Sequence, residues 1–576
     1  MIAFMKEIKM EKFKDLKYIR PSFEETEKAI EETLKEFIDA GDYETAKKAL
    51  LKKQEIAREF ATMASIAHIR HDVDMADPFY DEEIQYFNSV SPKLSVVNKK
   101  FNEALAASKF RKDFEEEFGD QLFKLLDADI RTNSSEVIEE RVQEAKLVNE
   151  YSKIAASCKT VFRGEECNFY GLLKHMLSTD REERKEALES WAALYESVSD
   201  KLDDVYGRLC AVRRKIAEKL GFDNYIDLAY LSRHRFDYTP KQIEAFRNAV
   251  VSYIVPVAKQ IHEEQRQRLG VEKLEYYDEQ LFFKDGNSTP DKDTAGMVEA
   301  ATKMYRELSK ETGEFFDFMV EYELFDLETK ANKRLGGYCT GLPKYKAPFI
   351  FSNFNKTSAD TEVLTHEAGH AFESYIANRN QILSEYTHST SEINEIHSMA
   401  MEFFTEPWYP LFYPEGEGKV YVYEHLADSL ANITYLVSVD EFQHRVFEGE
   451  QPSSKELRSI WKGIEEKFMP WRSYGDNEFL NNGGFWMQKQ HIFMYPFYYV
   501  DYALAMICAL QFYLRMREDR EAAWKDYMKL CSLGGSKGYF DLLKEANLKN
   551  PFEEETIKEV ADGVSKVLKE LEKTLD

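Results

Sequence analysis

The chain has 576 residues, with 77 lysines and arginines against 104 aspartates and glutamates, so its formal net charge is −27. This balance argues against nucleic acid or an anionic membrane as the main partner, because both are bound through clustered lysine and arginine. The composition, 43% hydrophobic and 31% charged, is typical of a globular protein and not of a disordered one. Only 15 prolines and 25 glycines accompany 33 tyrosines and 40 phenylalanines, which predicts a helical protein with an aromatic interior.

The cysteines and the apolar segments predict a cytoplasmic protein. The six cysteines are widely spaced and form no CxxC pair, so we expect neither a disulfide framework nor a thiolate zinc site. The first twenty residues carry charges where a signal peptide needs a continuous apolar stretch. The longest apolar run, 494–514, is interrupted by Asp501, Gln511 and several tyrosines, which favours a buried core helix over a membrane span.

In chain order, residues 22–157 show the periodicity of successive amphipathic helices, with stops expected near Gly41, Pro78, Pro92 and Asn133. We assign residues 1–165 to an N-terminal helical lobe and 166–576 to the region that carries the chemistry. The second part begins with helices expected at 180–198 and 202–220. The helical pattern is broken at 274–283 and 336–354, where glycine, proline, aromatic and β-branched residues indicate strands and turns. A last helix is expected within 551–576.

The most informative motif is the HExxH sequence His366-Glu367-Ala368-Gly369-His370. Helical periodicity and a capping residue at Thr357 place it on a helix, where residues four apart share one face. His366 and His370 can therefore direct two imidazoles at one point, with Glu367 beside them. Zinc accepts neutral imidazole ligands in this way and keeps a position open for water when it is catalytic.

A third protein ligand is needed, and its position separates the classes of zinc peptidase. The metzincin pattern requires glycine at position 373 and histidine at 376, but the sequence has Glu373 and Ile376, which excludes that class. The pattern of the following segment, 389–404, predicts a helix with a capping box from Ser389 to Glu392. It offers Glu392, Glu395, Glu402 and His397, and spacing alone does not choose among them.

The segments GGYCTGLP, PFIFSNF, HEAGHAFE and EINEIHSMAMEF within residues 336–404 resemble the active-site region of the thimet oligopeptidase and oligoendopeptidase F family of zinc peptidases. In that family the glutamate ligand lies on the helix after HExxH, and a second glutamate follows seven residues later. The resemblance thus implies that Glu395 is the ligand and Glu402 a supporting residue behind it. It also implies one Zn²⁺ per chain and a mainly α, two-lobed clamshell. A deep substrate channel and a small β-sheet beside the HExxH helix complete this expectation.

A second match lies downstream, where residues 491–502 resemble the family's His/Tyr segment, which faces the metal. With Pro496 as an early helix residue, Tyr495, Tyr499 and Tyr502 are expected on one helix face. The resemblance implies that Tyr502 and Tyr495 donate hydrogen bonds to the developing oxyanion, with His491 assisting, and that Tyr499 contacts the substrate. Glu367 is expected to act as the general base of amide hydrolysis.

We further expect the strand-like segment 347–353 to offer an edge along which an extended peptide pairs its backbone. Its candidate substrate-binding residues are Ala347, Phe349 and Ile350, together with Gly337 and Tyr338 from the glycine-rich approach. Cys339 is expected to be buried and inert.

The sequence thus predicts a zinc-dependent oligoendopeptidase that hydrolyses internal bonds of short unfolded peptides. Oligopeptides are the expected partners, and the oligomeric state is open. A dipeptidyl carboxypeptidase of the same broader family and a non-catalytic helical peptide-binding scaffold are the alternatives.

Overall fold

The computed structural model describes residues 10–575. Residues 1–9 and residue 576 lie outside it, so part of the segment that was compared with a signal peptide is not described. The chain forms two compact units, each built from three segments. Unit 1 comprises residues up to Ile130, Thr289–Glu415 and Arg515–Leu548, and unit 2 comprises Arg131–Ser288, Gly416–Leu514 and Lys549 onwards. The division into lobes at residue 165 stays a prediction.

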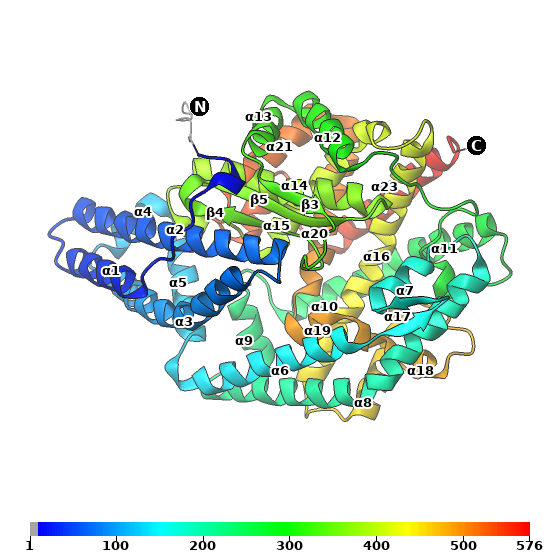
Figure 1. Cartoon of the computed structure of the whole chain (residues 1–576), viewed down its shortest axis with the longest axis horizontal. Helices are drawn as coiled ribbons and strands as arrows, with labels where there is room; N and C mark the ends of the chain where they lie inside the picture. The colour runs from blue at the N-terminus through cyan, green and yellow to red at the C-terminus, as the bar shows by residue number, and fades with distance from the viewer. Residues whose placement is uncertain (1–9, 576) are drawn as a thin grey trace. The chain divides into compact units, whose positions relative to one another are not determined.

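Unit 1 begins with three long helices that lie side by side, α1 (Phe23–Ile38), α2 (Tyr43–Val73) and α3 (Pro78–Ala106) (Figure 1). The short helices α4 (Arg111–Phe118) and α5 (Gln121–Thr132) follow. The side chain of Ser22 caps α1, and that of Asp42 caps α2, each by accepting a backbone amide. The expected stop at Pro92 is wrong, because this proline lies inside α3. The helix continues since Leu94, Val97 and Phe101 bury its opposite face.

A three-stranded sheet lies against helix α14 (Ser358–Asn380) in unit 1 (Figure 1). Its strands are β3 (Phe325–Glu328), β4 (Tyr338–Leu342) and β5 (Ala347–Phe354), in the order β3–β5–β4. Strand β4 pairs antiparallel with β5, and β3 pairs parallel with it. The strands expected within 336–354 and the small sheet beside the HExxH helix are therefore confirmed. The other helices of unit 1 are α12 (Thr294–Leu308), α13 (Lys310–Glu321), α15 (Ser391–Phe404), α21 (Arg520–Leu533) and α22 (Tyr539–Glu545).

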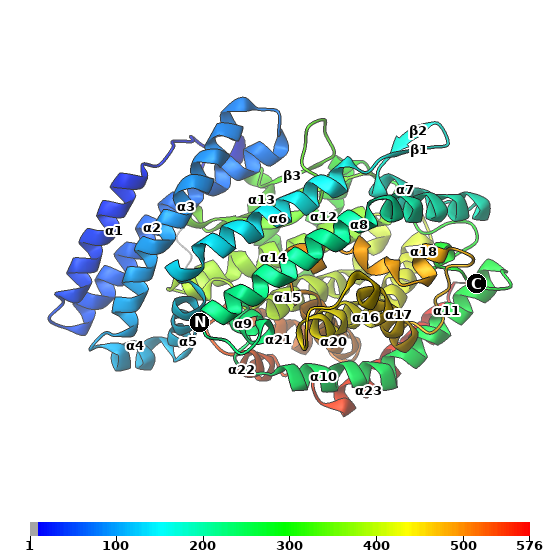
Figure 2. The same ribbon diagram turned by 90° about the horizontal axis from the view of Figure 1, so that it is seen from below.

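Unit 2 contains the long antiparallel pair α6 (Ile138–Ser157) and α8 (Arg181–Lys219), which lie side by side in both views (Figures 1 and 2). The two helices expected at 180–198 and 202–220 form this single helix α8, because nothing between them breaks the periodicity. The remaining elements are β1 (Thr160–Phe162), β2 (Glu165–Cys167), α7 (Phe169–His175), α9 (Tyr225–Ser232), α10 (Pro240–Ala249), α11 (Val255–Leu269), α16 (Glu417–Phe447), α17 (Ser454–Phe468), α18 (Glu478–Asn481), α19 (Gln490–Met494), α20 (Tyr499–Glu518) and α23 (Glu554–Glu572).

The predominance of helices and the aromatic interior are confirmed. In unit 2 the rings of Tyr206, Phe442, Trp486 and Phe493 contact one another, with centroid separations of 5.0–6.3 Å. Such contacts stabilise a core beyond the apolar area that they bury. Large aromatic rings therefore fill the interior between the helices, and the low content of glycine and proline agrees with the predominance of helices.

The apolar run 494–514 forms most of the buried helix α20, as expected. Among the described residues, no helix is both long enough and apolar enough to cross a membrane. The acidic interruption Asp501 is fully buried, where its carboxylate accepts from Arg235 at 2.5 Å and contacts Arg233 at 3.4 Å. A buried charge of this kind needs such partners.

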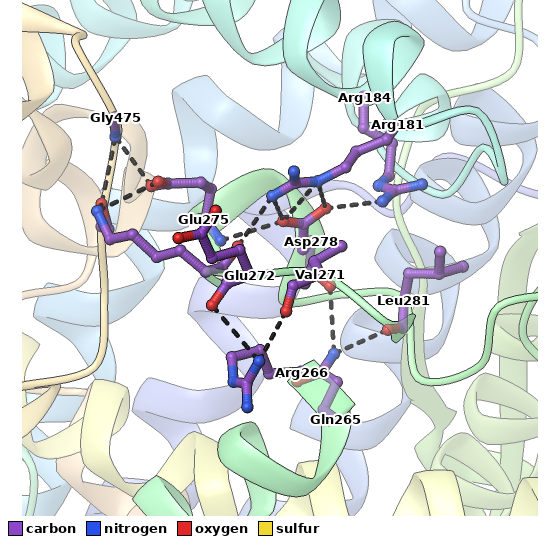
Figure 3. A network of polar contacts seen from close by, with 12 residues as sticks. Arg181, Arg184, Gln265, Arg266, Val271, Glu272, Glu275, Asp278, Leu281 and Gly475 are labelled. Carbon is purple, nitrogen blue, oxygen red and sulfur yellow. Dashed lines mark hydrogen bonds and ion pairs between the residues drawn. The ribbon is translucent and has the colours of Figure 1, made fainter. Parts of the chain in front are cut away.

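The segment 274–283 is not a strand, contrary to expectation, but a loop with one turn of 3₁₀ helix at Tyr276–Asp278. Its polar groups are satisfied by side chains instead of a neighbouring strand (Figure 3). The fully buried carboxylate of Asp278 accepts from Arg184 at 2.7 Å and from Arg181 at 2.8 Å. The amide of Gln265 donates to three backbone carbonyls, those of Asp278, Glu279 and Leu281.

We expect Asp278→Asn to destabilise unit 2, because Arg184, whose side chain is 3% exposed, would remain buried without its counter-charge. Breaking a buried pair in this way costs about 3–5 kcal/mol. Urea unfolding followed by circular dichroism measures the change. The matched control is Asp204→Asn, which removes an exposed partner of Arg208 and should cost less than about 1 kcal/mol. Equal stability of both variants would contradict the structural role of Asp278.

Candidate active site

Helices α14 and α15 carry the predicted metal ligands and pack against each other in unit 1. Thr357 occupies the N-cap position of α14 as predicted, although its hydroxyl donates to the side chain of Asn355 and caps no backbone amide. Helix α15 begins at Ser391 after Thr390, so the expected capping box at Ser389 is wrong. The hydroxyl of Ser389 donates instead to the carbonyl of Gly534.

Three side chains from these helices converge on one point. The Nε2 atoms of His366 and His370 lie 3.4 and 3.5 Å from Oε2 of Glu395. One ligand atom from each residue lies within 4.8 Å of the others. Two imidazoles and one carboxylate form the donor set of catalytic zinc sites, which leave a further position open. The residues therefore fit the metal that the sequence predicts.

Two further side chains contact the candidate ligands. Oε1 of Glu402 lies 2.6 Å from Nδ1 of His366, which leaves Nε2 of that ring directed toward the convergence point. The hydroxyl of Ser398 donates to Oε2 of Glu395 at 3.0 Å. Such partners fix the tautomer and the orientation of metal ligands. Glu402 was expected in this place from the family resemblance, whereas no sequence signal pointed to Ser398.

The two helices approach each other closely at Gly369. A Cβ atom at this position would lie 2.6 Å from Cα of Ser398 and 2.7 Å from the carbonyl oxygen of His397. Both are backbone atoms that cannot rotate away. The glycine inside HExxH thus sets the short distance at which Glu395 reaches the two histidines.

The charges at the site favour a bound cation. Burial tends to lower the pKa of His366, but hydrogen bonds to Glu395 and Glu402 outweigh it and raise this pKa well above the usual value. Burial also tends to raise the pKa of Glu395, but His370 and His366 outweigh it and lower that pKa strongly. Burial raises the pKa of Glu367, with only partial compensation from the two histidines. The site therefore combines the carboxylates of Glu395 and Glu402 with the buried carboxyl group of Glu367.

The other candidate ligands of α15 do not join this group. His397 is fully buried, where burial lowers its pKa to about 3 and Nδ1 lies 3.5 Å from Sγ of Cys531. Its imidazole is therefore neutral and directed toward α21. Glu392 is also buried, but it does not belong to the group of His366, His370 and Glu395 that converges among the described residues.

The predicted peptide-pairing edge at 347–353 is wrong. Strand β5 is the central strand of the sheet, with β3 on one side and β4 on the other, so both of its edges are occupied. Ala347, Phe349 and Ile350 are at most 3% exposed and serve the core. The adjoining edge strand is β4, where Tyr338 is half-buried and Gly337 just before it is exposed.

Cys339 on β4 is half-buried and not fully buried as expected. Burial, followed by the charges of Glu367 and Glu373, raises the pKa of its thiol well above the usual value. A thiol that stays protonated is a poor nucleophile, so the expected inertness agrees with the structure.

The predicted His/Tyr residues lie in unit 2, where His491 is close to the rings of Tyr495 and Tyr499, at 5.7 and 4.8 Å between centroids. The continuous helix expected through Pro496 is wrong, because α19 ends at Met494 and α20 begins at Tyr499. Tyr499 and Tyr502 share α20, whereas Tyr495 lies between the helices and is 48% exposed. Tyr495 and Tyr499 therefore lie close to His491, and Tyr502 contacts Tyr499 at 5.6 Å between centroids, but the three do not form one helical stripe.

The two convergent imidazoles and the carboxylate of Glu395, with Glu367 beside them, have the composition of a metallopeptidase site. The model of peptidase family M3 matches residues 174–562, and the model of the peptidase M3 N-terminal domain matches residues 13–133. The chain belongs to peptidase family M3.

Known proteins support this assignment. The chain is 43% identical to PZ peptidase A, whose structure was solved with an inhibitor, with 97% of this chain and 99% of that chain covered and a TM-score of 0.91. It is 24% identical over 431 residues to an oligoendopeptidase F homologue of Borreliella burgdorferi, covering 70% of each chain. An oligoendopeptidase F from Enterococcus faecium, 16% identical with a TM-score of 0.63 over 96% of this chain and 98% of that chain, shares the fold.

We expect Glu402→Ala to weaken zinc binding, because His366 loses the acceptor that orients its ring. Loss of such a partner lowers metal affinity by about 10–100-fold. Competition with a chromophoric chelator measures the affinity. Glu299→Ala, at an exposed position of α12, is the control and should bind zinc as the wild type does. Wild-type affinity in Glu402→Ala would contradict this role.

Proposed function

We propose that this chain is a zinc-dependent oligoendopeptidase that hydrolyses internal bonds of short unfolded peptides, with one Zn²⁺ bound by His366, His370 and Glu395. The observation that carries the proposal is the convergence of both Nε2 atoms and Oε2 of Glu395 in a chain of family M3. The relatives named as oligoendopeptidase F and PZ peptidase support the peptide as substrate.

The proposed mechanism assigns each proton to a named residue. When bound, zinc supplies Lewis acidity toward the scissile carbonyl and toward water. Glu367 takes a proton from the attacking water and passes it to the leaving amine. Its raised pKa, a consequence of burial, brings this carboxyl closer to the range in which a side chain both accepts and returns a proton.

The proposed oxyanion donors come from the His/Tyr segment, residues 491–502. Tyr502 and Tyr495 carry phenolic hydroxyls, and a well-placed donor to a developing oxyanion contributes about 3 kcal/mol. His491, whose ring lies against Tyr495 and Tyr499, assists them in this proposal. Tyr499 is buried at 8% exposure, which favours support of His491 over a direct substrate contact.

The proposed peptide-pairing strand is β4 in place of β5. Strand β4 pairs with β5 along one edge only, and no further backbone partner of Tyr338–Leu342 occurs among residues 10–575. Pairing through the backbone recognises extended peptides with little dependence on sequence. Gly337 and Tyr338 remain the proposed contacts from this approach.

We expect Glu367→Gln to retain zinc and to lose activity, because only the base is removed. The expected fall in kcat/KM is about 10²–10⁴-fold. His370→Ala and Glu395→Ala should lose both activity and stoichiometric zinc, measured by elemental analysis of the purified proteins. His68→Ala, at an exposed histidine of α2, serves as the control. Full activity of Glu367→Gln would refute the catalytic assignment.

We expect internally quenched peptides to be cleaved at internal bonds, whether or not their C-termini are amidated. Mass spectrometry of the products identifies the cleaved bonds. A requirement for a free C-terminal carboxylate, with release of dipeptides, would identify a dipeptidyl carboxypeptidase instead. Efficient digestion of an intact folded protein would contradict the restriction to short unfolded substrates.

A further inference from the structure

The segment that joins α14 to α15, residues 381–390, connects the two helices that carry the metal ligands. Its residues Leu383 and Tyr386 are buried in the apolar core formed with α1–α5. The hydroxyl of Tyr386 donates to the carbonyl of Phe118 at 2.8 Å and accepts from the amide of Leu122 at 2.9 Å. Residues of the same segment, among them Ile382, also line a pocket of about 790 Å³.

A diglycine turn at the end of α21 contacts the backbone of this segment directly. The amide of Gly535 donates to the carbonyl of Tyr386 at 3.0 Å. A Cβ atom at Gly534 would lie 2.1 Å from that carbonyl oxygen, and one at Gly535 would lie 2.1 Å from the carbonyl oxygen of His388. Gly534 also has φ +50° and ψ −135°, a conformation that side chains disfavour. Neither position therefore accepts a side chain without displacing the segment.

A short series of hydrogen bonds leads from this turn to the first turn of α15. The hydroxyl of Ser389 donates to the carbonyl of Gly534 at 2.6 Å. The side chain of Asn394 accepts from the amide of Ser389 at 3.1 Å and donates to its carbonyl at 3.2 Å. Asn394 directly precedes Glu395. Movement of the segment away from the turn would therefore be transmitted to the start of α15.

Helix α21 also contacts both ligand helices. The side-chain amide of Gln381, the residue after α14, donates to the carbonyl of Ser532 at 2.7 Å. The hydroxyl of Tyr527 donates to the carbonyl of His397 on α15 at 2.9 Å. One helix and its terminal turn are thus bonded to the end of α14, to the joining segment and to α15.

We propose that the Gly534–Gly535 turn is a positioning element of the metal centre, which fixes the segment 386–389 and thereby the distance of Glu395 from His366 and His370. This inference rests on the proposed zinc site and extends it to residues that touch neither metal nor substrate.

The test compares Gly535→Ala and Ser389→Ala with the wild type. We expect Gly535→Ala to raise the dissociation constant for Zn²⁺ at least tenfold, measured by chelator competition, and Ser389→Ala to raise it severalfold. The visible absorption of the Co²⁺-loaded proteins should change in the same order, because it reports ligand geometry. Thermal unfolding of the metal-free proteins should change little for Ser389→Ala, which removes one hydroxyl. Gly463→Ala, where a Cβ meets nothing within 4 Å, is the control and should match the wild type in zinc affinity and in the Co²⁺ spectrum.

Wild-type zinc affinity and an unchanged Co²⁺ spectrum in folded Gly535→Ala would overturn the proposal. If that variant does not fold, wild-type values in Ser389→Ala would overturn it. A wild-type protein that binds zinc but cleaves no peptide would refute the proposed function alone. Unaltered zinc affinity in variants of an active enzyme would refute the positioning role alone.

Discussion

The close approach of α14 and α15 is the constraint on which the candidate active site depends. It is set by the missing side chain at Gly369, where a Cβ would overlap the backbone of Ser398 and His397. Histidines four residues apart on one helix give two directed imidazoles, but they need a carboxylate from outside that helix. The short distance between the helices lets Glu395 reach both rings and lets Glu402 contact the far nitrogen of His366.

The HExxH helix, the strands at 336–354 and the helical class could all be predicted from the sequence, because each depends on local periodicity and residue type. The pair Glu395 and Glu402 was reached only through the family resemblance. From the residues alone, Glu392 and His397 were equal candidates. Their exclusion depends on which face of α15 turns toward α14, and this is decided by the packing of two helices.

The failed predictions share a physical cause, since each concerned a feature decided by distant partners. Strand β5 has a hydrophobic pattern that suits an edge or a centre, and only the presence of β3 makes it central. The loop around Asp278 has strand-like residues, but arginines of α8 and Gln265 of α11 satisfy its polar groups. Pro92 lies on the exposed side of a helix that is held by its buried side. The contacts of Gly369 and Gly535 likewise had no local signal.

Unit 1 is completed by residues 515–548, more than a hundred residues after the HExxH helix. A ribosome that has already translated α14 and α15 has yet to produce α21, the helix that is hydrogen-bonded to Gln381 after α14 and to His397 of α15. Domains generally fold as units. A product truncated before Arg515 would therefore keep every candidate ligand but would lack helix α21, which contacts both of the helices that carry them.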